Sequence, residues 1–194
     1  YPLQLGVLSV PITIIAVIAL TNAINMIDGL DGLAAGVVLI SIIGLICFHL
    51  TLDFSPIISI LVAVAFALLP FFIFNIAPYV KTKIFLGDGG SLYLGFIISW
   101  ALIYSAENVS NFNPTFALWC VVIPLFDFLS VIILRMLKKQ SLITAKKDHV
   151  HHFLENIGCS KSLILLLILF FGLATLMLGI FIEMNFPDLS FLVY

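Results

Sequence analysis

The first segment whose residues could carry chemistry is NAINMIDGLDG, residues 22–32. Asn22, Asn25 and Asp28 recur at a spacing of three, which places them on one face if a helix continues this far. Asp31 extends the set into a turn that contains glycine. Two carboxylates and two amides are suited to Mg²⁺ or to a hydroxylated ligand. Asp-Gly pairs also mark turns and Asn and Asp cap helices, so a purely structural turn is the alternative.

The second segment is FLGDGGS, residues 85–91. Its glycines let the backbone approach a ligand, and Asp88 could hold a metal ion. Ser91 could cap the helix that follows, whose N-terminus would then face an anion. Lys81 and Lys83 lie just upstream and suit phosphate. A glycine-rich turn with a capping Asp is the structural alternative.

The third segment is KKDHVHH, residues 146–152, with three histidines in four residues after two lysines. A zinc site is one interpretation, although Cys159 or Glu155 would have to complete it at a poor spacing. We favour an anion-binding loop in which imidazole N–H groups and ammonium charges meet phosphate oxygens. A basic segment that binds anionic lipid head groups is the third interpretation.

The elements that must position these segments are apolar helices. Of 194 residues, 63% are hydrophobic and 9% are charged, whereas soluble domains average about 45–50% and about 25%. Too few charges remain to cover a soluble surface, which disfavours a cytosolic globular enzyme, a disordered chain and a nucleic-acid-binding protein. The composition predicts an all-α, polytopic membrane protein.

Six charge-poor stretches are each long enough to predict a membrane-spanning helix, within a single integral membrane domain over residues 1–194. The predicted helices lie near 5–23, 33–50, 56–74, 91–106, 115–134 and 163–182. With six alternating spans, all 8 Lys and Arg residues fall on connections at one side. The positive-inside rule makes that side cytoplasmic.

Asp127 falls inside the fifth predicted helix, eight residues before Arg135. At 1.5 Å per residue this places its carboxylate about 12 Å below the helix end. An ionisable group at such depth is costly and suggests a function. The alternative is a carboxylate neutralised by a neighbouring polar group.

Carboxylates, a glycine turn, lysines and histidines thus converge at one side of a hydrophobic bundle. A Mg²⁺-dependent reaction between a phosphorylated soluble donor and a lipid acceptor would need this combination. A transporter is the alternative, but it predicts polar residues along several spans rather than at one end.

Four segments, in this order, carry a resemblance to a known family: NAINMIDGLDGLAAG, FLGDGGSLYLGF, PLFDF and KKDHVHHF. Over residues 20–155 the chain resembles the polyprenyl-phosphate N-acetylhexosamine-1-phosphate transferases of glycosyltransferase family 4. The HxHH form is most similar to the branch that uses UDP-N-acetylglucosamine and undecaprenyl phosphate. Such enzymes release UMP and begin cell-wall polysaccharide, lipopolysaccharide or O-antigen synthesis at the cytoplasmic face of the bacterial inner membrane.

The resemblance implies roles for individual residues. Asp28, Asp31 and Asp88 correspond to catalytic acids, and Asp88 with Asp28 would bind Mg²⁺, with Mn²⁺ as a substitute. Asp127 corresponds to a supporting acid. The residues implied in binding the nucleotide sugar are Asn25, Lys83, Gly87, His149, His151 and His152.

The chain departs from the family at one point, since it contains no Asp-Asp-x-x-Asp motif. In the family that motif lies on an earlier loop. We therefore expect the C-terminal part of a longer transferase domain, or a non-catalytic remnant of one. The implied partners are a UDP-sugar, a polyprenyl phosphate and the membrane, with a homodimer as an option.

Overall fold

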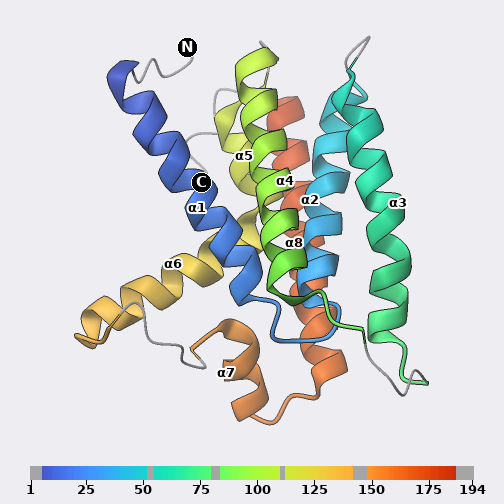
Figure 1. The fold of residues 1–194 in the computed structure, drawn as a ribbon, viewed down its shortest axis with the longest axis vertical. Coiled ribbons are helices and arrows are strands. Elements are labelled where there is room, and N and C mark those ends of the chain that lie inside the picture. The colour runs from blue at the N-terminus through green and yellow to red at the C-terminus, as the bar shows by residue number, and fades with distance from the viewer. Residues whose placement is uncertain (1–5, 52–54, 80–83, 110–111, 142–147, 187–194) are drawn as a thin grey trace.

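The computed structural model describes residues 6–51, 55–79, 84–109, 112–141 and 148–186. Every regular element in these ranges is helical (Figure 1). The elements are η1 (Gly6–Leu8), α1 (Ser9–Met26), α2 (Leu33–His49), α3 (Ile57–Ile76), α4 (Gly87–Asn108), α5 (Pro114–Cys120), α6 (Val122–Leu137), α7 (Val150–Asn156) and α8 (Lys161–Asn185).

Helices α1 to α4 and α8 run roughly along the long axis of the molecule, while α6 crosses that direction and α7 lies beneath the bundle (Figure 1). Helix α1 packs on α4, and α2 packs on α3 and α8. Gly95 lets α1 and α4 meet closely, because a Cβ atom there would lie 2.7 Å from the Cα atom of Thr21. The core between the helices contains the fully buried side chains of Ile24, Ile42, Leu61, Ile98 and Leu176.

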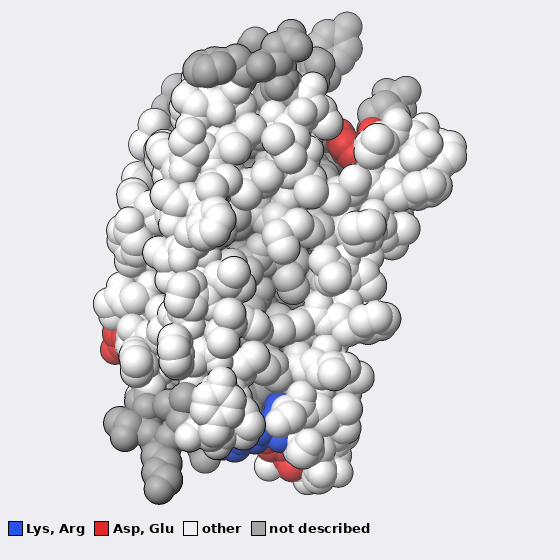
Figure 2. Space-filling view, turned by 90° about the vertical axis from the view of Figure 1, so that its right-hand side faces the viewer, with Lys and Arg blue, Asp and Glu red and all other residues white. Residues whose placement is uncertain are grey.

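The prediction of an all-α, polytopic membrane protein is confirmed. By length and composition, four helices can each cross a membrane: Gly6–Met26, α3, α4 and α8. Helices α5 and α6 would form a fifth span if counted together, and α2 is a shorter apolar helix. The lateral face in Figure 2 is uncharged over its middle, and the Lys and Arg atoms visible on it gather near the lower end.

The prediction of one straight helix over 115–134 is wrong, because α5 and α6 are bent by 85°. The cause lies at Pro124, which has no N–H to donate to the carbonyl of Cys120 four residues earlier. That carbonyl instead accepts a hydrogen bond of 2.7 Å from the Ser41 hydroxyl of α2. The bend turns α6 out of the bundle, so the depth predicted for Asp127 along a straight span does not apply.

Candidate functional site

The acid-bearing loop, residues 27–32, joins α1 to α2. Its apolar residues Ile27 and Leu30 are buried in a cluster that includes Ile164 and Ile168 of α8. The two acids of the loop, Asp28 and Asp31, are only partly buried. The loop is therefore anchored through its apolar side chains while its carboxylates stay accessible.

The glycine-rich segment does not form the predicted turn, because α4 already begins at Gly87, which adopts a φ of 66°. Gly89 and Gly90 lie in the first turn, and Asp88 is exposed there. Ser91 is buried and is not the cap of this helix. Its hydroxyl instead donates to the Gly87 carbonyl at 3.0 Å.

Asn25 links the end of α1 to the start of α4. Its Nδ2 donates to the Ser91 hydroxyl at 2.8 Å and lies 3.3 Å from Oδ1 of Asp88. The amide thereby fixes the start of α4, with its exposed carboxylate, beside the acid-bearing loop.

The carboxylates of this region repel one another. Burial, followed by the negative charges of Asp88 and Asp31, raises the pKa of the Asp28 carboxyl to about 6. A cation between the acids would relieve this repulsion. Within the described ranges, no three His, Cys, Asp or Glu side chains are grouped closely enough to hold a metal ion unaided.

This donor set fits Mg²⁺ better than zinc. Mg²⁺ is usually held by one or two carboxylates together with waters and substrate phosphates, whereas a zinc site needs three or four protein ligands. Asp28 and Asp88, from two different segments, would supply the two carboxylates.

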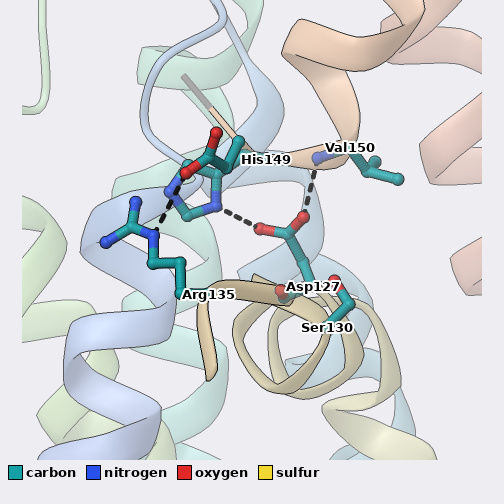
Figure 3. Close-up of polar contacts among 6 residues, drawn as sticks. Asp127, Ser130, Arg135, His149 and Val150 are labelled. Atoms are coloured by element: carbon teal, nitrogen blue, oxygen red, sulfur yellow. Dashed lines mark hydrogen bonds and ion pairs between the residues drawn. The ribbon is translucent and has the colours of Figure 1, made fainter. Parts of the chain in front are cut away.

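The histidine segment is held by α6 (Figure 3). Asp127 makes two contacts with it: Oδ2 lies 2.7 Å from Nδ1 of His149, and Oδ1 accepts a hydrogen bond of 2.8 Å from the backbone N–H of Val150. Nε of Arg135 also donates to Oδ2 of Asp148 at 3.1 Å. The carboxylate of Asp127, on α6, is therefore satisfied by polar groups at the start of α7. This agrees with the structural alternative, a carboxylate neutralised by a neighbouring polar group.

His151 brings the third segment against the first. Its side chain is only 1% exposed, and a Cβ atom on Gly29 would lie 2.7 Å from its Nε2. Burial, then the neighbouring His152, lowers the pKa of His151 to about 4, so the imidazole is neutral at pH 7. His152 lies beside it and contacts Glu155 at 3.1 Å.

The structure thus assembles most of the predicted site residues at one end of the bundle. One group, Asn25, Asp28, Asp31, Gly87 and Asp88, lies at the junctions of α1, α2 and α4. The second group, Asp127, His149, His151 and His152, lies where α6 meets α7. Lys83, like Lys81, Lys146 and Lys147, lies outside the described residues, so its predicted role in substrate binding stays a prediction.

Two residues in this region were not singled out from the sequence. Arg135 is 4% exposed and pairs with Asp148, although the sequence indicates only a charge at a helix end. Asn75 is an isolated amide near the end of α3, whose last two turns are otherwise apolar, and it hydrogen bonds to two other segments. A lone Asn at the end of a spanning helix is the signal that could have identified it.

An apolar helical bundle that gathers ionisable side chains at one end defines a polytopic membrane protein with a candidate polar site at that end. Residues 2–106 match the family model described as glycosyl transferase family 4. The chain belongs to this family, and the prediction made from the four motifs is confirmed.

Three relatives show how much of the family the chain covers. Proteins named undecaprenyl-phosphate alpha-N-acetylglucosaminyl 1-phosphate transferase are 36% identical in Pasteurella multocida, over 61% of this chain and 34% of the relative, and 34% identical in Haemophilus influenzae, over 65% and 36%. A Bacillus subtilis protein named "Probable undecaprenyl-phosphate N-acetylglucosaminyl 1-phosphate transferase" is 35% identical over 87% of this chain and 47% of its own length. The chain therefore spans between a third and a half of these relatives.

Proposed function

We propose that this chain supplies the acid- and histidine-bearing part of a transferase that moves N-acetylglucosamine 1-phosphate from a UDP-sugar to undecaprenyl phosphate. The observation that carries the proposal is the meeting of the acid-bearing loop, Asp88 and His151 at one end of an apolar bundle. The printed names of the relatives supply the acceptor and the transferred group. They also favour a transferase over the transporter alternative.

In the proposed reaction, an oxygen of the acceptor phosphate attacks the sugar-linked phosphorus of the donor. The bond from that phosphorus to the bridging oxygen breaks, and UMP leaves. The second pKa of a phosphate monoester lies near 6, so the acceptor is largely dianionic at neutral pH. A strong general base is therefore not required, and the acids are free to serve other roles.

Asp28 and Asp88 are the residues that would hold a divalent cation, which we propose to be Mg²⁺. When bound, it would offset the negative charge that develops on the pyrophosphate. Asp31 adds a third carboxylate to the loop beside them. Asn25 orients this group, since its amide contacts both Asp88 and Ser91.

The histidines are proposed to bind the nucleotide sugar. A neutral imidazole such as His151 can donate a hydrogen bond to a phosphate oxygen without depending on protonation in the neutral pH range. His149, oriented by Asp127, and His152, which contacts Glu155, present two more rings on the same short segment.

The proposed location of the reaction is the cytoplasmic face of the bacterial inner membrane. Among the described residues, Arg135 lies in the last turn of α6, Lys138 and Lys139 follow that helix, and Lys161 begins α8. These cations lie at the end of the bundle that carries the acids, which supports a cytoplasmic orientation through the positive-inside rule.

The test is release of UMP by the complete protein in membranes supplied with UDP-N-acetylglucosamine, undecaprenyl phosphate and Mg²⁺. We expect Asp88→Asn to lower the rate by about 100-fold or more, because it removes electrostatic support for the transferred group. Glu107→Gln, the same change at the opposite end of α4, is the matched control. Near wild-type turnover of Asp88→Asn would refute the role of Asp88. Binding of the donor without any turnover by the wild type would instead favour a non-catalytic remnant.

A further inference from the structure

Asn75 joins the two segments that carry the candidate acids. Its Oδ1 accepts a hydrogen bond from the backbone N–H of Gly32, and its Nδ2 donates to the carbonyl of Ile84 at 2.7 Å. Gly32 ends the acid-bearing loop, whereas Ile84 precedes Asp88 by four residues. One side chain on α3 is therefore hydrogen bonded to the backbone of both segments that carry the candidate acids.

Both ends of this amide are engaged in a buried position. Asn75 is 4% exposed, near the end of a helix whose other residues in the last two turns are apolar. A buried amide that lost a partner would leave a polar group unsatisfied, which is costly. Its two backbone partners are far apart in the chain, so the hydrogen bonds fix their relative position.

The surroundings of Gly32 leave little freedom for another arrangement. Gly32 has a φ of 80°, and a Cβ atom on it would lie 2.3 Å from Cγ2 of Ile76. The end of the acid-bearing loop thus lies directly against the last turn of α3. Asn75 makes the polar contact at this junction. It accepts a hydrogen bond from the Gly32 N–H, which is one of the N–H groups that have no partner within α2 itself.

Asp28 and Asp88 are like charges on separate segments, and like charges move apart unless the backbone restrains them. We infer that Asn75 is a positioning residue that sets the distance between the acid-bearing loop and the start of α4. Its consequence for catalysis rests on the proposed function. The restraint itself depends only on the hydrogen bonds.

Hydrogen exchange of the complete protein tests the restraint directly. In Asn75→Leu we expect the Gly32 amide to exchange about tenfold faster or more, as its hydrogen bond is lost, and residues 84–91 to exchange faster as well. Asn108→Leu is the matched control, because Asn108 lies at the far end of α4 and its amide, among the described residues, bonds to the Tyr104 carbonyl of its own helix. Unchanged exchange at both segments of Asn75→Leu would overturn the inference.

Asn75→Asp tests the two hydrogen bonds separately and distinguishes their loss from a general loss of folding. A carboxylate still accepts from Gly32 but cannot donate to Ile84. The Gly32 amide should therefore stay protected while residues 84–91 exchange faster than in the wild type. Equal acceleration in every helix of both variants would assign Asn75 to general stability and overturn the inference.

The kinetic consequence is a shift in the divalent-cation requirement. In UMP-release assays, we expect the Mg²⁺ concentration for half-maximal rate to rise about tenfold in Asn75→Leu, because losing one fixed hydrogen bond changes an equilibrium by roughly this factor. An unchanged requirement with a lower rate would overturn the positioning role. If the wild type released no UMP, the proposed function would fail, while hydrogen exchange would still decide the role of Asn75.

Discussion

The imidazole of His151 lies directly over Gly29, so close that a Cβ atom on Gly29 would stand 2.7 Å from its Nε2. Within the described residues, that buried nitrogen has no hydrogen-bond partner. The contact joins segments more than a hundred residues apart and sets α7 over the acid-bearing loop. A glycine is needed at this position because there is no space for a side chain.

The contact predicts a strong steric coupling between the two residues. Gly29→Ala should lower the free energy of unfolding by about 1–3 kcal/mol, since overpacking forces neighbouring groups to shift. In a His151→Ala background the same substitution should cost much less, because the clashing ring is gone. Thermal melts of the four proteins give the coupling energy. Equal costs in both backgrounds would show that the two residues do not touch.

Asp127 should act through the position of α7. Asp127→Asn removes the charge that pairs with His149 and accepts from Val150, so we expect faster exchange over residues 148–158 and a rise of about tenfold in KM for the UDP-sugar. Ser130→Ala is the control, because that hydroxyl, in the part of the chain that the structure describes, bonds to the backbone carbonyl of Asp127 and not to its carboxylate. A fall in kcat without a change in KM would contradict this role.

The stability of the ion pair between Arg135 and Asp148 should depend on the shape of the guanidinium. The arginine contacts Asp148 through Nε, an atom that lysine lacks. Arg135→Lys should therefore destabilise the protein by about 1–2 kcal/mol, a value reduced by the partial exposure of Asp148. Asp148→Asn should cost less, and the double variant should cost less than the sum. Additive melting shifts would argue against the pair.

Two groups should make stability depend on pH in opposite directions. The pKa of His151 is about 4 in the fold against an ordinary 6.5, so its contribution is present above pH 6.5 and is lost as pH falls toward 4. The pKa of Asp28 is about 6 against 3.8, so its contribution is present below pH 3.8 and is lost as pH rises through 6.

Single variants separate these two effects. In Asp28→Asn, the increase in Tm from pH 4 to pH 6 should be steeper than in the wild type, because the opposing carboxyl is gone. In His151→Asn the increase should shrink or reverse. Thermal melts in one buffer series at fixed ionic strength measure both slopes. Parallel slopes in all three proteins would contradict the assignment.

Much of the fold follows from the sequence because apolar composition over about 20 residues is enough to favour a helix in lipid. All six predicted helical segments are helical, with boundaries that differ by a few residues, and the fifth is broken. The local start of α4 was less predictable. By propensity, the segment GDGG (residues 87–90) favours a turn, but Asn25 and the buried Ser91 hold it in the first turn of a helix.

The sequence by itself determined the helical class, the chemistry of the three polar segments and their common end, because hydropathy and residue type are local properties. The tertiary structure decided how the segments meet. The Cys120 carbonyl left free by Pro124 is satisfied by Ser41 of α2, the position of α7 depends on Asp127 and Gly29, and the two acid-bearing segments are both bonded to Asn75. Each is a contact between residues far apart in the chain, so no local pattern specifies it.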